Sequence, residues 1–209
     1  MSNSLNTLPL KHELPALEVK QLTGDEFFHH QKNNLPINIL AFWRWSASNL
    51  AGNNLRGHLA EYLVASDFGR TQDTRIEWDS CDLRINSNIR VEVKSSAFLQ
   101  SWQQKKLSSI SFNIAPTFGW DSRSGNSSTE CLRGSDVYIF CLLAHKEKTT
   151  LDPTNLDQWE FFVLPTSELD NKLGTQKTLS LSGLLKLAPI NCKYGQIAKT
   201  VMSLLEKPN

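Results

Sequence analysis

The stretch that decides the fold is DLRINSNIRVEVKSS, residues 82–96. Its apolar residues alternate with charged ones, which is typical of strands with one buried face. A three-residue loop at 86–88 pairs Ile85 with Ile89 and Leu83 with Val91, so that every apolar side chain shares one face. A two-residue turn would place apolar residues opposite charged ones throughout. The sequence therefore predicts a β-hairpin in the first register.

The second face of this hairpin collects charged side chains, namely Asp82, Arg84, Arg90, Glu92 and Lys94. In the predicted register Asp82 lies across from Glu92, with Cβ atoms about 5 Å apart, and like charges so placed repel. A divalent cation would relieve that repulsion, and Mg²⁺ accepts one or two carboxylates together with waters. Lys94 follows Glu92 about 7 Å along the same face. Asp79 competes with Asp82, but its parity places it with the apolar residues. The plain alternative is a solvated sheet face.

Composition sets wider limits. The chain has 209 residues, 40% of them apolar and 21% charged, and its formal net charge is +1. These values fit one globular domain and argue against a protein that coats nucleic acid non-specifically. No apolar run approaches the ~18 residues of a membrane span. The four cysteines are scattered, which indicates reduced thiols rather than a zinc site or a disulfide framework. We therefore expect a cytoplasmic protein without a membrane partner.

The rest of the chain predicts alternating helices and strands. Helices are expected at 25–33, at 37–69 with a break at 52–54 and a cap from Asn53 or Asn54, at 166–174 and at 194–207. Strands are expected at 74–79, 81–86, 89–95, 136–145 and 158–165, with a short helix and then a strand over 97–114. Residues 1–24 predict an extended arm, and the Gly- and Ser-rich residues 119–134 predict a long loop. The division is an N-terminal arm and helix (1–52), a core (53–165) and C-terminal helices on the same domain (166–209).

Asp82, followed ten residues later by Glu92-Val93-Lys94 on the next strand, resembles the D…(D/E)xK signature of the PD-(D/E)xK nuclease superfamily. Glu61, on the helix before the first strand, matches a glutamate that many members carry. The resemblance covers about residues 53–145. Cys81 stands where the signature has proline, and the helix after the third strand is short. The resemblance implies an α/β fold with a restriction-endonuclease-like core, a mixed sheet flanked by helices, and here an N-terminal arm and a C-terminal helical decoration.

By the same resemblance, the catalytic residues are Asp82, Glu92, Lys94 and Glu61. Mg²⁺, or Mn²⁺ in its place, would be held by Asp82, Glu92, the backbone carbonyl of Val93 and Glu61, the last through water or at a second metal. Lys94 would orient the attacking water and help to deprotonate it. The candidates for nucleic-acid contact are Ser95, Ser96, Gln100, Lys105 and Lys106. For Ser95, Ser96 and Gln100, the alternatives are a role in holding the site in place and a plain strand end. For the two lysines, the alternative is a solvated turn.

The implied activity is Mg²⁺-dependent hydrolysis of phosphodiester bonds in DNA by an endonuclease. A restriction or defence role comes first, and a repair or recombination nuclease comes second. A third alternative is a non-catalytic nucleic-acid- or protein-binding module that retains the fold. The recognition sequence, the choice between DNA and RNA, and the oligomeric state, including a homodimer, stay open.

Overall fold

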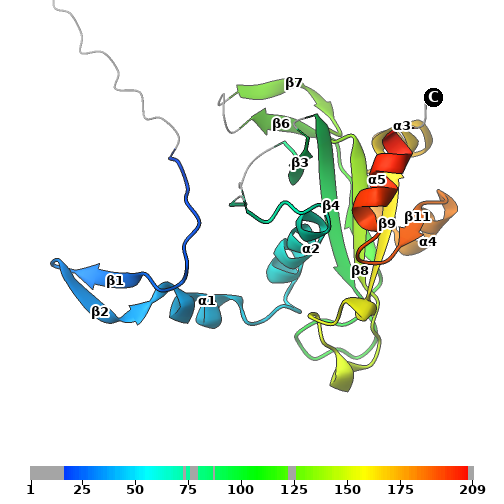
Figure 1. Ribbon diagram of the computed structural model, residues 1–209. Helices are drawn as coiled ribbons and strands as arrows, with labels where there is room; N and C mark the ends of the chain where they lie inside the picture. Colours follow the sequence, from blue (N-terminus) through cyan, green and yellow to red (C-terminus); the bar gives the residue numbers. More distant parts are fainter. Residues whose placement is uncertain (1–16, 73, 76–79, 87, 122–125, 207–209) are drawn as a thin grey trace, which may run out of the picture.

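A five-stranded mixed sheet forms the centre of the protein (Figure 1). The computed structural model describes residues 17–72, 74–75, 80–86, 88–121 and 126–206. The strands, in spatial order, are β11 (Ile190–Cys192), β9 (Trp159–Pro165), β8 (Val137–Leu143), β4 (Ile89–Ala97) and β3 (Leu83–Ile85). β4 and β8 run parallel, and every other neighbouring pair of this sheet is antiparallel. The predicted α/β class with a mixed sheet flanked by helices is confirmed.

β8 occupies the middle of the sheet because its sequence is apolar throughout. All seven of its residues are buried, as the run VYIFCLL predicts for a strand covered on both faces. One face of the sheet packs against α2 (Asn53–Asp67) and α5 (Ile197–Leu205). The elements over the other face are α3 (Thr166–Leu173), α4 (Leu181–Lys186) and a two-stranded sheet of β5 (Ser111–Asn113) and β10 (Thr178–Ser180). Two short 3₁₀ helices, Lys148–Thr150 and Leu156–Gln158, lie between β8 and β9.

The β3–β4 hairpin has the predicted register. Leu83 pairs with Val91, Arg84 with Arg90 and Ile85 with Ile89. Asn86 opens the turn in the left-handed region, with φ of 50°, which asparagine tolerates better than most residues. The apolar face is buried, and this fixes the register, because a slip by one residue would carry charges into the core. The separate strand predicted at 74–79 is absent at 74–75, and 76–79 lie outside the described residues.

The predicted helix within 97–114 is wrong. Residues 98–110, all of them described, contain no helix, although β5 supplies the predicted strand. Side chains hold the loop instead: Gln100 Nε2 donates to Ala97 O, and Gln104 Nε2 donates to Phe98 O. Lys148 Nζ donates to the carbonyls of Gln100 and Trp102. Such side-chain bonds compete with helical ones for the backbone.

The long loop predicted at 119–134 is also wrong. Most of the described part of this segment belongs to an antiparallel hairpin of β6 (Thr117–Asp121) and β7 (Asn126–Leu132), which stands beside β3 in Figure 1, and residues 122–125 lie outside the described residues. Glycine and serine content correlates with loops but does not determine them. Because this hairpin exposes residues of both strands, it lacks the alternation that marks a half-buried strand.

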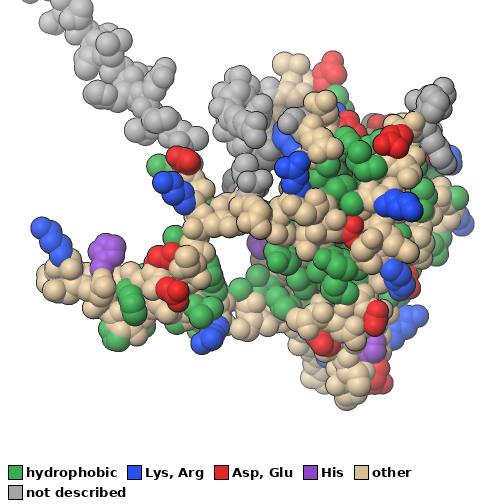
Figure 2. All heavy atoms as spheres, viewed as in Figure 1, with side chains coloured by type: hydrophobic (Ala, Val, Ile, Leu, Met, Phe, Trp, Pro, Cys, Tyr) green, Lys and Arg blue, Asp and Glu red, His purple; other side chains and the backbone are tan. Residues whose placement is uncertain are grey.

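The N-terminal segment differs from its prediction as well. The expected helix at 25–33 is a hairpin of β1 (Phe27–His30) and β2 (Asn33–Asn38), with Gln31 and Lys32 at positive φ in its turn. α1 (Ile39–Ala47) follows, capped by the Asn38 side chain, and none of its nine described residues is buried. Residues 17–47, which we call the arm, extend away from the sheet (Figure 1) and carry exposed hydrophobic side chains (Figure 2).

The helix boundaries follow the sequence closely. α1 and α2 are separate, as predicted, but Gly52 rather than an asparagine occupies the N-cap of α2. Gly69 ends that helix at φ of 66°. α3 and α5 confirm the two C-terminal helices, while β11 makes the C-terminal third part of the main sheet as well as a helical layer. No helix of the described residues is long and apolar enough to cross a membrane.

Candidate active site

The charged face of β4 carries two residues of the candidate site, Glu92 and Lys94. Arg90, Glu92 and Lys94 alternate with Val91 and Val93, whose side chains are buried in the core below α2. This alternation follows from the two-residue period of a strand. Glu92 and Lys94 keep 20% and 27% of their side chains exposed, so both are accessible without being fully solvated. As predicted, they share one face of the strand.

Asp82 lies just before β3 and turns towards β4. Its backbone N–H donates to Val91 O at 3.1 Å, and its carboxylate Oδ2 accepts from the N–H of Val93 at 2.7 Å. The ladder ends at the pair of Leu83 and Val91, so the prediction that Asp82 pairs directly with Glu92 is wrong. The carboxylate is instead fixed at the backbone between Glu92 and Lys94. Asp79, the competing candidate, lies outside the described residues.

The electrostatics of Asp82 show that carboxylates converge here. Burial first, and then the negative charges of Glu92 and Glu61, raise the pKa of Asp82 to about 7, although the Val93 N–H and the Lys94 ammonium oppose the rise. Three carboxylates, which we call the carboxylate cluster (Asp82, Glu92 and Glu61), are therefore close enough to repel one another. Such repulsion favours either a bound proton or a bound cation.

Glu92 is held by two donors. Lys94 Nζ lies 2.5 Å from Glu92 Oε1, and Ser135 Oγ donates to Glu92 Oε2 at 3.0 Å. The hydroxyl pKa of the neighbouring Tyr138 is raised by burial and then by the charge of Glu92, which keeps that hydroxyl protonated. Sequence reasoning missed Ser135, because it lies 43 residues after Glu92 and only the pairing of β4 with β8 brings them together.

Glu61 comes from α2, as predicted, and 14% of its side chain is exposed. Arg75 pairs with it through two hydrogen bonds, Nε to Oε2 at 2.5 Å and Nη2 to Oε1 at 3.2 Å. No pattern in the sequence linked Arg75 to Glu61. The guanidinium thus orients the third carboxylate of the cluster.

The donor set fits one kind of metal better than others. Among the described residues, no group of three or more His, Cys, Asp or Glu side chains is arranged to hold a metal ion. Charge acts over longer distances than coordination, so Glu61 can raise the pKa of Asp82 without reaching a shared ion. Asp82 and Glu92 suit Mg²⁺, which takes one or two carboxylates and keeps several waters. The carbonyl of Val93 as a ligand stays a prediction.

Ser95 and Gln100 occupy an internal network. Arg56, which is 5% exposed, donates from Nε to Ser95 Oγ at 3.3 Å and from Nη1 to Gln100 Oε1 at 3.2 Å. The same guanidinium donates to Asn53 Oδ1, so it ties the start of α2 to the end of β4. Ser96 and Gln100 are buried. Of the alternatives open for these residues, this arrangement favours a role in positioning the site.

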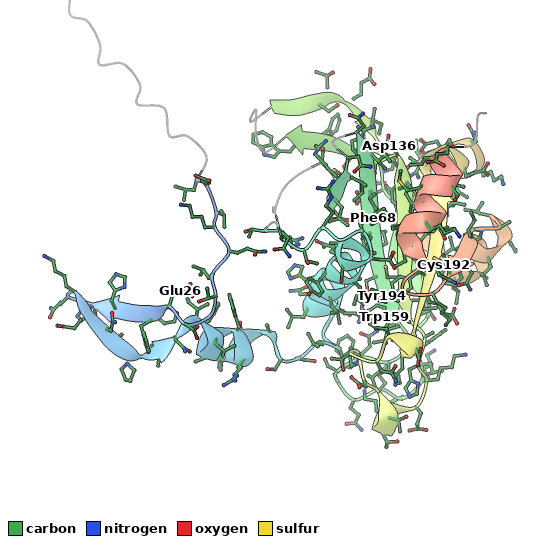
Figure 3. The ribbon with its side chains drawn as sticks, in the orientation of Figure 1. Glu26, Phe68, Asp136, Trp159, Cys192 and Tyr194 are labelled. Carbon is green, nitrogen blue, oxygen red and sulfur yellow. The ribbon has the colours of Figure 1, made fainter. Side chains whose placement is uncertain are left out.

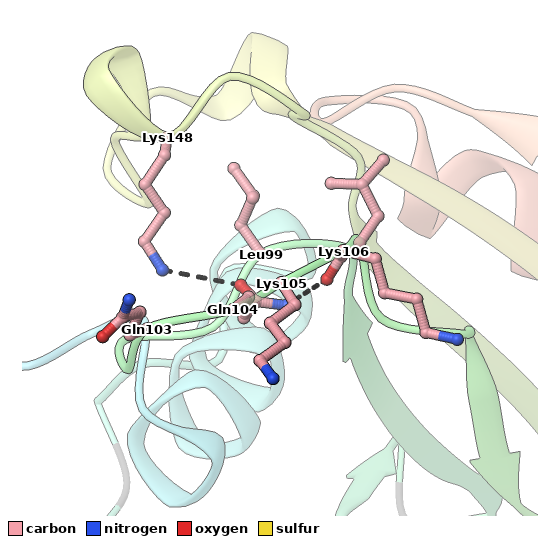
Figure 4. Close-up of a pocket in the computed structure, with 7 residues that line it drawn as sticks. Leu99, Gln103, Gln104, Lys105, Lys106 and Lys148 are labelled. Atoms are coloured by element: carbon pink, nitrogen blue, oxygen red, sulfur yellow. Dashed lines mark hydrogen bonds between the residues drawn. The ribbon is translucent and has the colours of Figure 1, made fainter.

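Lys105 and Lys106 lie apart from the carboxylate cluster. They line a pocket of about 350 Å³ on the loop after β4, together with Leu99, Gln103, Gln104, Leu107 and Lys148 (Figure 4). Lys148 and Gln104 meet across this pocket at 3.5 Å. No hydrogen bond or ion pair among the described residues links either lysine to Asp82, Glu92 or Lys94. Their contact with nucleic acid stays a prediction.

Comparison with known proteins identifies no relative from which a function could be inferred. Comparisons with protein-family models, with curated proteins and with solved structures found no match. A functional proposal for this chain therefore depends on the chemistry of the carboxylate cluster and of Lys94.

Proposed function

We propose that the protein is a Mg²⁺-dependent endonuclease that hydrolyses phosphodiester bonds in DNA, built on a restriction-endonuclease-like core of the PD-(D/E)xK kind. The observation that carries the proposal is the approach of Asp82 to Glu92 beside Lys94. A solvated sheet face does not require an aspartate whose pKa is raised by burial and, after that, by the charges of two other acids. A site for a hydrated divalent cation and a phosphate does require that combination.

Asp82, Glu92 and Lys94 would have different roles in this reaction. Asp82 and Glu92 would hold the ion, with Asp82 anchored by the Val93 N–H and Glu92 by Ser135. Mg²⁺, when bound, stabilises charge on the phosphoryl oxygens and supplies hydroxide near neutral pH. Lys94 would exchange its bond to Glu92 for one to the attacking water or the scissile phosphate. Its ammonium would then offset the charge that develops there.

Glu61 would act from α2 without being a direct ligand. Because Arg75 holds both of its carboxylate oxygens, Glu61 contributes negative charge at a fixed place. That charge would favour a cation beside Asp82, and a water between Glu61 and the ion would complete the arrangement. Among nuclease roles, restriction or defence remains our first prediction and repair or recombination our second.

One observation favours a second candidate, the non-catalytic binding module. Glu92 and Glu61 each have a cationic side chain as a partner, Lys94 and Arg75 respectively, so part of the cluster is already neutralised within the chain. A protein that had lost metal binding would keep such pairs. Cleavage distinguishes the two candidates, because only the enzyme needs the cation.

The test is incubation of supercoiled plasmid with purified protein and Mg²⁺, Mn²⁺ or chelator. We expect nicked or linear DNA with either metal and intact plasmid with chelator. The variant Asp82→Asn should be inactive, while the matched surface variant Asp25→Asn, on the exposed arm, should cleave normally. Binding of DNA without cleavage under every metal would favour the binding module.

A further inference from the structure

A pair of arginines lies next to the carboxylate cluster on the same face of the hairpin. Arg84 pairs directly with Arg90 across β3 and β4, and directly opposed residues point to the same side of a sheet. Arg90 precedes Glu92 by two residues on β4, so the pair stands about 7 Å from Glu92 along the strand. Arg90 is also ion-paired with Asp136, so the two guanidiniums lie side by side with part of their charge already balanced. The arrangement suits an anion that lies over both guanidiniums.

Both guanidiniums are held in place. Arg90 Nη2 donates to Asp136 Oδ1 at 2.9 Å, and the Arg90 backbone N–H donates to Asp136 Oδ2 at 2.8 Å. Figure 3 places Asp136 at the end of the sheet nearest the β6–β7 hairpin. Arg84 is exposed, and its Nη2 donates to Ser80 Oγ at 3.0 Å. A phosphate here would meet oriented donors, and guanidinium groups match phosphate geometry well.

The β6–β7 hairpin lies close to Ser80, the residue that accepts the hydrogen bond from Arg84. A Cβ on Gly119 would lie 3.6 Å from Ser80 Cβ, and one on Gly134 would lie 3.3 Å from Ser80 O. Ser135, immediately after this contact, donates to Glu92. The hairpin therefore rises directly beside both the arginine pair and the carboxylate cluster.

This hairpin presents aromatic rings to solvent. Phe118 is 64% exposed and Trp120 is 43% exposed, and both belong to β6. Large aromatic side chains normally bury most of their surface, so two exposed on one short strand indicate a binding surface. Proteins bind unpaired nucleotides with exposed rings beside cationic side chains, since every base offers a face for stacking.

We propose that a nucleic-acid strand leaving the carboxylate cluster places its next phosphate on Arg84 and Arg90 and stacks an unpaired base on Phe118 or Trp120. This inference rests on the proposed function and adds to it the path of the strand and a preference for substrates with unpaired bases. The adjacent guanidiniums favour nucleic acid over a protein partner, because a protein would need acidic groups aligned with the same rings.

The test measures binding without hydrolysis, in chelator, by fluorescence anisotropy. The probes are a fluorescein-labelled single strand and a blunt duplex of the same sequence. Arg84→Gln should lower the slope of log affinity against log salt by about one for both probes. Trp120→Ala and Phe118→Ala should each weaken single-strand binding about tenfold and duplex binding less. The matched controls, Trp45→Ala on the arm and Lys186→Gln on α4, should match the wild type.

Cys131 gives a second readout that needs no substitution at Arg84, Phe118 or Trp120. It pairs with Phe118 across the hairpin and is exposed, whereas the other three cysteines are buried. Single-stranded DNA should therefore slow its reaction with N-ethylmaleimide, and Lys186→Gln should leave that protection unchanged. Full reactivity of Cys131 under saturating DNA would overturn the proposed path.

The outcomes separate this inference from the proposed function. Cleavage that is the same in the wild type, Arg84→Gln, Phe118→Ala and Trp120→Ala would overturn the strand path and leave hydrolysis standing. Binding that depends on the hairpin, without cleavage under any metal, would support the path and remove the hydrolytic function. If the aromatic variants instead turn a sedimenting dimer into a monomer and bind DNA normally, the hairpin is a protein interface and the inference fails.

Discussion

The carboxylate of Asp82 accepts a hydrogen bond from the backbone N–H of Val93, the residue between Glu92 and Lys94. This bond joins the segment before β3 to the middle of β4 and sets the distance between the two acids. A carboxylate held in this way cannot move away from Glu92 to relieve repulsion. The predictions below follow from that constraint and from the packing around it.

Metal binding should stabilise the protein. If Asp82 and Glu92 share a cation, Mg²⁺ or Mn²⁺ at about 100 times its Kd should add about 2.7 kcal/mol to the free energy of unfolding. For a chain of this length, that corresponds to a rise in Tm of about 5–10 °C. Differential scanning fluorimetry with and without metal measures it. Asp82→Asn should lose the rise and Asp25→Asn should keep it, and an unchanged rise in Asp82→Asn would place the metal elsewhere.

The pH dependence of stability should carry the signature of Asp82. Its pKa rises from an ordinary value of 3.8 to about 7 on folding, so the native state binds this proton more tightly than the unfolded state. The stability that the proton contributes is fully present below about pH 4 and is lost as the pH rises towards 7. Without metal, urea unfolding should therefore show Asp82→Asn gaining stability relative to the wild type between pH 4 and 7. A constant difference across that range would contradict the raised pKa.

A second aspartate tests the packing of the helices rather than the chemistry. Asp67, at the end of α2, accepts from the backbone N–H groups of Gly195, Ile197 and Ala198, the last at 2.9 Å, and so caps the N-terminus of α5. Because it replaces a local N-cap, Asp67→Ala should cost about 1–2 kcal/mol of stability. Chemical denaturation measures the loss, and Asp25→Ala is the matched exposed control. Equal stability of the two variants would show that α5 needs no such cap.

The sequence predicted those elements whose side chains have one buried and one exposed face, or two buried faces. The period of two in residues 82–96 determined the register of β3 and β4, because the alternative would bury charges. The run over 137–143 identified the central strand. The β1–β2 and β6–β7 hairpins were missed because exposed strands show no burial pattern, and the loop after β4 was missed because Gln100 and Gln104 compete for its backbone.

The site was predictable to a similar degree. Spacing placed Glu92 and Lys94 on one face, whereas Glu61 on the preceding helix became a candidate only through the resemblance to the nuclease superfamily. The turn of Asp82 towards Val93, the clamp of Arg75 on Glu61 and the bond from Ser135 to Glu92 depend on tertiary packing. Partners 11, 14 and 43 residues apart in the chain leave no periodic trace from which they could be paired.

Cleavage by Lys94→Ala tests the central claim most directly. On a solvated sheet face, the pair of Lys94 and Glu92 would contribute at most about 1 kcal/mol of stability and nothing else. At a phosphodiesterase site, the ammonium is oriented towards the charge that develops in the transition state. Lys94→Arg should rescue poorly, because a broad guanidinium does not replace a compact point charge.

The decisive measurement is the single-turnover rate of plasmid cleavage in Mg²⁺ by the wild type, Lys94→Ala and the surface control Lys186→Ala. We predict that Lys94→Ala folds and binds metal like the wild type but cleaves at least about a hundredfold more slowly, with Lys186→Ala unchanged. A Lys94→Ala protein that cleaves at the wild-type rate would contradict the mechanism.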